Sequence, residues 1–278
     1  LQATLRGHRR ISYAQFSPDG RRILSSSYDG SVRVWKVADA TQQHVYRDHG
    51  GTVYGAAFDH EGGHIASAGV DNRVVVRSLT GGPPVIHAGH RDWVLGVAFS
   101  PNDRQLLSAS KDGTIRILDA RRASSTVRVL RGHDGPVNTA TFSPDGQQVL
   151  SGGADRTVRV WSLRGERPVV LRGHQGAVES VAFDPTGDRI VSSGVDGTVR
   201  IWDPHGGEPL VTLREYRDRA WTGSFSPNGA NILSSGDDTV WLESCEVCGT
   251  TADIVKLARA RVHRQLSGSE RERFLGTP

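Results

Sequence analysis

The sequence predicts an all-β fold in which short antiparallel strands form a series of similar sheets. A phenylalanine before a turn recurs at spacings of 41 to 43 residues, at Phe16, Phe58, Phe99, Phe142, Phe183 and Phe225. An aspartate at a tight turn follows each one, at Asp29, Asp71, Asp112, Asp155, Asp196 and Asp238. Apolar and polar residues alternate between these markers, as in half-buried strands. A fixed period of this length indicates a repeat architecture.

Each period reads as four short strands bounded by turns. In the first repeat we expect strands at Ile11–Phe16, Arg22–Ser27, Val32–Val37 and His44–Arg47. The Ser-Pro-Asp-Gly segment after Phe16 suits a tight turn, because proline fixes φ and glycine tolerates positive φ. In the sixth repeat the expected strands are Ala220–Phe225, Asn231–Ser235 and Thr239–Glu243.

Two further markers keep the same period. A histidine, usually after glycine, occurs at His8, His49, His90, His133 and His174, and Tyr216 takes the sixth place. The residue six positions after the turn aspartate is Trp35, Arg77, Leu118, Trp161 or Trp202, with Glu243 in the shorter sixth repeat. With Trp202-Asp203 as its one literal Trp-Asp pair, the chain resembles the WD-repeat family of β-propellers over roughly residues 1–244. The resemblance implies six four-stranded blades around a channel.

The first residues of the chain lack a blade of their own. Leu1–Arg6 matches the outer strands that precede the other Gly-His pairs, and the sixth repeat has no outer strand after Thr239–Glu243. We therefore predict that Leu1–Arg6 pairs with Thr239–Glu243 and closes the ring, which would leave no exposed edge. A seventh blade upstream in a longer parent protein is the alternative. The sixth blade should be the least regular.

Residues 245–278 differ in composition from the repeats. Cys245 and Cys248 form a Cys-x-x-Cys pair, which is half of a zinc site or a redox motif, but the chain has no other cysteine. We favour two packed thiols, and we expect no metal and no cofactor. Thr250 to Leu266 reads as an amphipathic helix, and a short second helix follows. This tail resembles those after WD-repeat arrays in bacterial multidomain signalling proteins.

Composition and the chain ends indicate what kind of protein this chain comes from and where in the cell we expect it. The net charge is +4, arginine greatly outnumbers lysine, and the chain has no methionine and begins at Leu1. We read it as a piece of a longer, actinobacterial-like protein with further domains. No apolar run reaches the length of a membrane span and no signal peptide is visible. We expect a cytoplasmic protein that does not engage a membrane.

The recurring serine, histidine and aspartate have the residue types of a hydrolase triad. A catalytic site needs one such set beside a substrate cleft, whereas this chain repeats the set in five blades. In the family these residues and the tryptophan form a structural hydrogen-bonded chain within each blade, so we expect no enzyme. Arg77 and Leu118 lack the indole N–H and should shorten the chain in their blades. The predicted network comprises His8, Ser25, Asp29, Trp35, His49, Ser67, Asp71, His90, Ser108, Asp112, His133, Ser151, Asp155, Trp161, His174, Ser192, Asp196 and Trp202.

Partners of WD-repeat propellers usually dock on the face that bears the channel entrance. Three sets of positions form this face: two flank the start of each inner strand, and the third precedes the turn aspartate. Carried onto this chain, they give an aromatic and basic patch, whose residue types are enriched at interface hot spots: Arg10, Tyr28, Tyr54, Trp93, Leu95, Lys111, Arg219 and Trp221. The alternative is that Trp93 and Trp221 plug the channel as core residues.

The sequence thus indicates a protein–protein interaction scaffold or sensing module of a larger bacterial signalling protein. The first alternative is a propeller hydrolase or lyase with a site at the channel mouth, where Glu179 and Asp237 are the acids we can place. The second is a nucleic-acid binder. We do not expect the second, because the arginines are spread over strand faces of all repeats: Arg33, Arg73, Arg116, Arg159 and Arg200.

Overall fold

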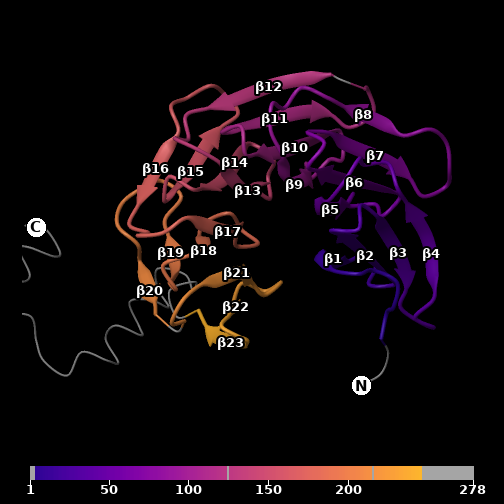
Figure 1. Ribbon diagram of the computed structural model, residues 1–278. Helices are drawn as coiled ribbons and strands as arrows, with labels where there is room; N and C mark the ends of the chain where they lie inside the picture. Colours follow the sequence, from indigo (N-terminus) through magenta and orange to yellow (C-terminus); the bar gives the residue numbers. More distant parts are fainter. Residues whose placement is uncertain (1–3, 124, 215, 246–278) are drawn as a thin grey trace, which may run out of the picture.

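The computed structural model describes residues 4–123, 125–214 and 216–245, and these residues form strands and turns without a helix. Their 23 strands make six antiparallel sheets, which we call blades one to six in chain order. The blades stand side by side around a central space (Figure 1). The all-β class and the repeated four-stranded sheets are therefore confirmed.

Within each blade the strands follow chain order from the centre outward. The inner strands are β1 (Ile11–Phe16), β5 (Val53–Phe58), β9 (Val94–Phe99), β13 (Val137–Phe142), β17 (Val178–Phe183) and β21 (Ala220–Phe225). The second strands are β2 (Arg22–Ser27), β6 (His64–Gly69), β10 (Gln105–Ser110), β14 (Gln148–Gly153), β18 (Ile190–Gly194) and β22 (Asn231–Gly236). The third strands are β3 (Val32–Lys36), β7 (Val74–Ser78), β11 (Thr114–Asp119), β15 (Thr157–Ser162), β19 (Val199–Trp202) and β23 (Thr239–Ser244). The outer strands are β4 (Gln42–Tyr46), β8 (Val85–His87), β12 (Thr126–Arg131), β16 (Val169–Arg172) and β20 (Val211–Leu213).

The turn after β1 shows why the strands end where they do. The Ser17 hydroxyl donates to the carboxylate of Asp19, and the amide of Gly20 donates to the Ser17 carbonyl at 2.9 Å. Gly20 has a φ of 69°, a left-handed conformation that glycine adopts without steric cost. The same Ser-Pro-Asp-Gly turn recurs in blade four, where the Ser143 hydroxyl donates to Asp145.

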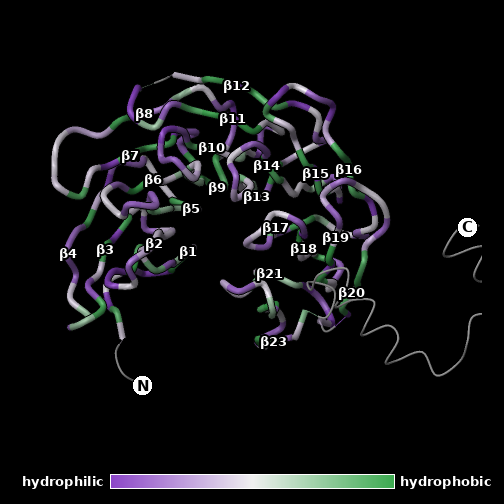
Figure 2. Tube along the Cα trace, turned by 180° about the vertical axis from the view of Figure 1, so that it is seen from behind, coloured by the Kyte–Doolittle hydropathy of each residue, from purple (hydrophilic) through white to green (hydrophobic). Residues whose placement is uncertain are grey.

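Blades pack face to face through apolar side chains. Leu24, Val32 and Val34 of blade one form a buried cluster with residues of blade two that include Val53 and Phe58. The later interfaces repeat this arrangement, so in blades two to five one face contacts the next blade and the other face contacts the previous one. Hydrophobic segments accordingly follow the strands and hydrophilic ones the turns (Figure 2).

A β-bulge lies near the start of every inner strand. The pairing of each inner strand with its neighbour skips one residue, namely Ser12, Tyr54, Leu95, Asn138, Glu179 and Trp221. Bulges redirect side chains and disturb the ladder locally. Five of these six residues, all except Ser12, line the central cavity, which has a volume of about 530 Å³. In blades two to six the bulge therefore directs one side chain toward the cavity.

The predicted closure of the ring is not observed. Thr4–Arg6 forms no strand, and β23 pairs with β22 alone among the described residues. Blade six thus has three strands instead of the predicted four, and β1 and β21–β23 border a gap in the arc (Figure 1). Residues 1–3 of the predicted closing strand lie outside the described residues, and β1 and β23 border opposite sides of the gap (Figure 1). The predicted helices between Thr250 and Leu275 lie outside the described residues.

Candidate functional site: the polar network and the entrance face

Three blades contain the complete hydrogen-bonded chain of tryptophan, serine, histidine and aspartate. In blade five, Trp202 Nε1 donates to Ser192 Oγ at 2.8 Å, and that oxygen lies 2.7 Å from His174 Nε2. His174 Nδ1 lies 3.0 Å from the carboxylate of Asp196. Because the indole N–H can only donate, the hydroxyl donates to Nε2, and the protonated Nδ1 donates to the carboxylate. The matching chains are Trp35–Ser25–His8–Asp29 and Trp161–Ser151–His133–Asp155.

Blades two and three have the shorter chains that their substitutions predict. His49 bonds Ser67 and Asp71, and the replacement Arg77 binds Asp48 through two nitrogens, at 2.6 and 3.0 Å. In blade three the chain runs from Ser108 through His90 to Asp112. Leu118, at the tryptophan position, is buried and has no polar group to contribute.

Blade six has different hydrogen bonds at the positions of the histidine and the turn aspartate. The Tyr216 hydroxyl lies 2.8 Å from Ser234 Oγ, so the phenol takes the place of the imidazole. We expected Asp238 at the turn position. Instead, Asp237 accepts the backbone N–H groups of Arg217 and Asp218, as the turn aspartate does for one such group in other blades. The hairpin is one residue shorter than the others, and this shortening shifts the acceptor back by one position.

A fifth member of the network was missed from the sequence. A serine or threonine two residues after the turn aspartate donates to that carboxylate and approaches the histidine Nδ1. Thr198 Oγ1 lies 2.8 Å from Asp196 and 3.2 Å from His174. The signal was present as a recurrence at Ser31, Thr114, Thr157 and Thr198.

Burial and hydrogen bonding act in opposite directions on the charge of these groups. Burial by itself would raise the pKa of Asp155, but hydrogen bonds from Asp134 N, Thr157 and His133 lower it to about 2. Burial lowers the pKa of His133, and the Asp155 carboxylate offsets this only in part. The pair therefore holds a charged carboxylate beside a neutral imidazole at neutral pH.

These groups have triad geometry without access to substrate. Ser25, Ser67, Ser108, Ser151 and Ser192 are all buried. In three blades the hydroxyl oxygen also accepts the indole N–H. A nucleophile must be able to reach a substrate carbon. The geometry therefore supports a bracing role within each blade.

The entrance face is organised by a backbone hydrogen bond that recurs in five blades. The residue before the turn aspartate donates its amide to the residue before the inner strand: Tyr28 to Arg10, Val70 to Thr52, Lys111 to Trp93, Ala154 to Pro136, and Val195 to Ala177. Side chains of the first and third predicted sets are thus neighbours. In blade one this places the Arg10 guanidinium 4.4 Å from the Tyr28 ring, and in blade three it places Lys111 Nζ 4.4 Å from Trp93.

Five of the eight predicted patch residues form one continuous row across blades one to three. Tyr28 contacts Tyr54 edge to face at 5.9 Å between centroids, and Tyr54 contacts Trp93 at 5.8 Å. Arg10 and Lys111 cap the two ends. Trp93 is 39% exposed, so it lies at the surface rather than within the core. We call Arg10, Tyr28, Tyr54, Trp93 and Lys111 the aromatic row.

The other patch residues lie elsewhere. Arg219 stacks on Trp221 at 4.3 Å in blade six, across the gap from blade one, and Trp221 is 55% exposed. Leu95 and Trp221 line the central cavity together with Glu179. Burial raises the pKa of the Glu179 carboxyl, and Arg219, at 3.9 Å, lowers it in part. Tyr54 lines the same cavity, so the aromatic row reaches the cavity at Tyr54, while Leu95, Arg219 and Trp221 lie outside the row.

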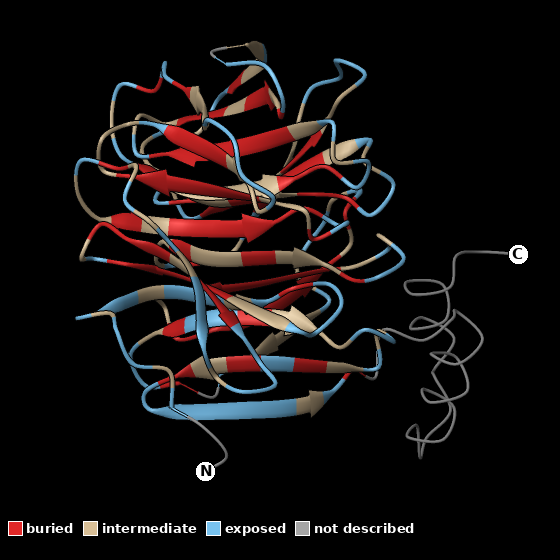
Figure 3. Cartoon of the chain, turned by 90° about the vertical axis from the view of Figure 1, so that its right-hand side faces the viewer, coloured by how far each residue is buried: buried red, intermediate tan, exposed pale blue. Residues whose placement is uncertain are grey.

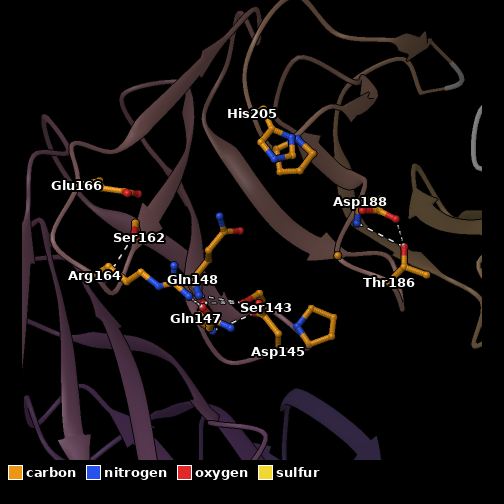
Figure 4. Close-up of a pocket in the computed structure, with 13 residues that line it drawn as sticks. Ser143, Asp145, Gln147, Gln148, Ser162, Arg164, Glu166, Thr186, Asp188 and His205 are labelled. Carbon is orange, nitrogen blue, oxygen red and sulfur yellow. Dashed lines mark hydrogen bonds between the residues drawn. The ribbon is translucent and has the colours of Figure 1, made fainter.

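A polar pocket of about 320 Å³ lies between blades four and five, among the turns that follow β13 and β17. Its polar groups already serve local turns. Ser143 Oγ accepts the amide of Gln148, and the Thr186 hydroxyl donates to Asp188 at 3.0 Å (Figure 4).

Metal and membrane features are lacking within the described part of the chain. No cluster of three or more His, Cys, Asp or Glu residues there has metal-binding geometry. No described helix has the length and apolar character that a membrane crossing requires. Cys245 is buried and disulfide-bonded, contrary to the packed free thiols that we favoured, while Cys248 lies outside the described residues.

Comparisons with known proteins agree with this architecture. The family model of the WD domain, G-beta repeat (WD40) matches residues 1–36, 40–78, 82–119, 124–162 and 165–203. The chain is 33% identical over 106 residues to WD repeat-containing protein SL1-17 of Schistosoma mansoni, covering 38% of this chain and 35% of that protein. It is 29% identical over 142 residues to guanine nucleotide-binding protein subunit beta-5b of Danio rerio, covering 48% and 36%. It is 30% identical over 194 residues to the guanine nucleotide-binding protein subunit beta of Arabidopsis thaliana, covering 49% and 52%.

The chain spans between about a third and a half of the length of these three relatives. Four of the matched segments, from 40–78 to 165–203, begin with the outer strand of one blade and end with the third strand of the next blade. Together they cover more than half of the sequence. The chain therefore belongs to the WD40 repeat family.

Proposed function

We propose that this WD40 domain is a protein-interaction module without enzymatic activity, and that it binds an acidic segment with apolar side chains on its entrance face. The observation that carries the proposal is the aromatic row. Rigid aromatic rings offer contact area at low entropic cost, and the two terminal cations select against basic partners. Two of the relatives are named as subunits of larger assemblies, which agrees with an interaction role.

The enzyme alternative receives less support. It would need acids that converge at the channel mouth. Glu179 lines the central cavity, but Asp237 is engaged by two backbone N–H groups of its own turn. The five Ser-His-Asp sets are buried. A general acid and base would have to share one accessible site, and these groups do not.

The strand arginines give little support to nucleic-acid binding. Arg159 lies 3.2 Å from the Asp155 carboxylate and stacks near Trp161, and Arg200 is buried beside Asp196. Such guanidinium groups brace their own blades and are not free to contact phosphates.

The expected setting, a larger cytoplasmic signalling protein of bacterial type with further domains, belongs to the same proposal. The excess of arginine over lysine supports it, although the relatives reported above are eukaryotic.

A defined peptide panel tests the binding proposal. We would measure dissociation constants for 15-residue peptides that combine Asp or Glu with Phe, Trp or Leu, against charge-reversed peptides with Lys or Arg. The acidic set should bind more tightly, with an affinity that falls as salt rises. Trp93→Ala and Lys111→Gln should each weaken binding about tenfold, a loss of about 1.4 kcal/mol.

Leu210→Ala is the matched control, because Leu210 is 46% exposed and lies beside the outer strand of blade five. This variant should bind like the wild type. Equal binding of both peptide sets, or an equal loss with Leu210→Ala, would contradict the proposal. A Trp93→Ala variant with a large drop in melting temperature would instead assign Trp93 to the core. A hydrolase activity abolished by one serine substitution would favour the enzyme alternative.

A further inference from the structure

The aromatic row has an even spacing and lies where a partner can reach it. Exposed residues gather in the connections at the ends of the strands, whereas the strands between them are largely buried (Figure 3). Tyr28 and Trp93 belong to such connections and are 41% and 39% exposed. The ring centroids of Tyr28 and Tyr54 are 5.9 Å apart, and those of Tyr54 and Trp93 are 5.8 Å apart. The three rings thus follow one another in two nearly equal steps.

A cation terminates the row at each end. The Arg10 guanidinium lies 4.4 Å from the Tyr28 ring. Lys111 Nζ lies 4.4 Å from the Trp93 ring. Neither cation forms an ion pair with a described residue, so each can pair with a carboxylate of a partner. The equivalent positions in blade four carry neither an aromatic ring nor a charge: Pro136, Asn138 and Ala154.

The spacing of the row fits an extended chain. In a β-strand the side chains on one face are about 6.6–6.8 Å apart, and less when the strand twists. A helix fits less well, because residues on one face alternate between three and four positions apart, which is about 4.5 and 6 Å along the axis. Six steps of an extended chain cover about 20 Å. The four contacts that join Arg10 to Lys111 can cover no more than about this distance, so a segment of about seven extended residues reaches both cations.

We propose that the aromatic row binds its partner segment in an extended conformation and in one register. The segment carries two apolar residues two positions apart, with an acidic residue two positions before the first and another two positions after the second. Its carboxylates pair with Arg10 and Lys111, and its apolar side chains lie against the rings. The residues at the intervening positions point away from the row and select little. This register rests on the proposed function, because it specifies the acidic and apolar segment further.

Peptides of the same composition but different spacing test this register. The matched peptide reads Glu-x-Phe-x-Phe-x-Glu, with Gly or Ser at x, and the rearranged peptide reads Glu-Glu-x-x-x-Phe-Phe. A third, Ala-based helical peptide presents the same two Glu and two Phe along one helix face. We expect the matched peptide to bind about tenfold more tightly than either of the others in fluorescence anisotropy titrations.

A charge-removing variant shows whether each carboxylate has its own partner. Replacing one Glu of the matched peptide by Gln should weaken binding to the wild-type protein about tenfold, but it should change binding to Lys111→Gln little. Arg91→Gln is the matched control, because Arg91 is an exposed cation of the same blade outside the row. This control should keep the wild-type difference between the two peptides. Unchanged melting temperatures would show that both variants fold.

The outcomes distinguish the register from the proposed function. Equal affinities for the matched and rearranged peptides, or tighter binding of the helical peptide, would overturn the register while leaving an acidic partner in place. The same would follow if the missing Glu weakened binding equally in the wild type and in Lys111→Gln. If no acidic peptide binds more tightly than its Lys-substituted counterpart, the proposed function fails and the register fails with it.

Discussion

The guanidinium of Arg77 forms a bidentate ion pair with the carboxylate of Asp48, with Nη2 2.6 Å from one oxygen and Nε 3.0 Å from the other. Both residues depart from the repeat pattern at once. Asp48 stands where Gly7, Gly132 and Gly173 precede the histidine, and Arg77 stands where those blades carry tryptophan. A Cβ on Gly173 would lie 3.1 Å from the indole ring of Trp202. Glycine thus accompanies tryptophan at this pair of positions, and aspartate accompanies arginine.

This coupling predicts a double-mutant result. Arg77→Trp alone should lower the free energy of unfolding by about 1–3 kcal/mol, because the indole crowds the Asp48 side chain and leaves its partly buried carboxylate unpaired. Asp48→Gly combined with Arg77→Trp should recover most of that loss, since the new indole can reach Ser67. Urea unfolding of the two single variants and the double variant measures the coupling. Additive losses would show that the two positions are independent.

The serine at the centre of the network should contribute more to the free energy of unfolding in blades that contain the tryptophan. Ser192→Ala leaves both Trp202 Nε1 and His174 Nε2 without their buried partner, at a cost of about 2–4 kcal/mol. Ser108→Ala leaves one such group, on His90, and should cost about 1–2 kcal/mol. Both serines are fully buried, so each is a matched control for the other. Equal losses in denaturant unfolding would contradict the role given to the indole.

His87 should weaken the fold in mild acid. It is buried in β8, and neither ring nitrogen has a partner among the described residues. Burial lowers the pKa of His87 below its usual 6.5. As pH falls below about 6.5 the unfolded chain therefore takes up the proton first, and stability decreases.

His87→Leu should remove this contribution and raise stability at neutral pH by about 1–2 kcal/mol, because an apolar side chain replaces an unsatisfied polar one. Melting temperatures between pH 7.5 and 5 give the readout. Val127→Leu, at an exposed residue of β12 that carries no titratable group, is the control and should leave the pH profile unchanged. A His87→Leu profile parallel to that of the wild type would disprove the assignment.

Much of the fold could be read from the sequence because the markers are periodic. Predicted strands such as Ile11–Phe16 and Arg22–Ser27 match β1 and β2, and Glu243 occupies the tryptophan register opposite Ile232. The hydrogen-bonding residues recur in each repeat, so their positions followed from spacing. The closure of the ring could not be predicted in the same way, because the pattern of Leu1–Arg6 fits an outer strand of either blade six or an additional blade.

The entrance face was harder to predict. Its positions came from family resemblance, but the contacts depend on the bulge at Tyr54 and on the backbone pairing that places Lys111 on Trp93. Both features recur at the repeat spacing, but the residue types at these positions differ from blade to blade, so the sequence does not show which side chains meet. The shift from Asp238 to Asp237 came from a hairpin one residue shorter, in which both aspartates adopt positive φ. The shorter sixth repeat is visible in the sequence, but its length alone does not indicate which of the two aspartates accepts the backbone N–H groups.

Acid unfolding should depend on the turn aspartates, and Asp155 offers the clearest case. Its folded pKa is about 2, against about 3.9 in an unfolded chain. The stabilisation is therefore complete above about pH 4 and is lost as pH falls toward 2, because the unfolded state binds the proton first. Asp155→Asn should lower stability at pH 7 and flatten the decline between pH 4 and 2. Urea unfolding at a series of pH values measures both effects, with Glu208→Gln on the surface as control. If Asp155→Asn and the wild type lose stability in parallel over that range, the carboxylate is not the source of the acid sensitivity.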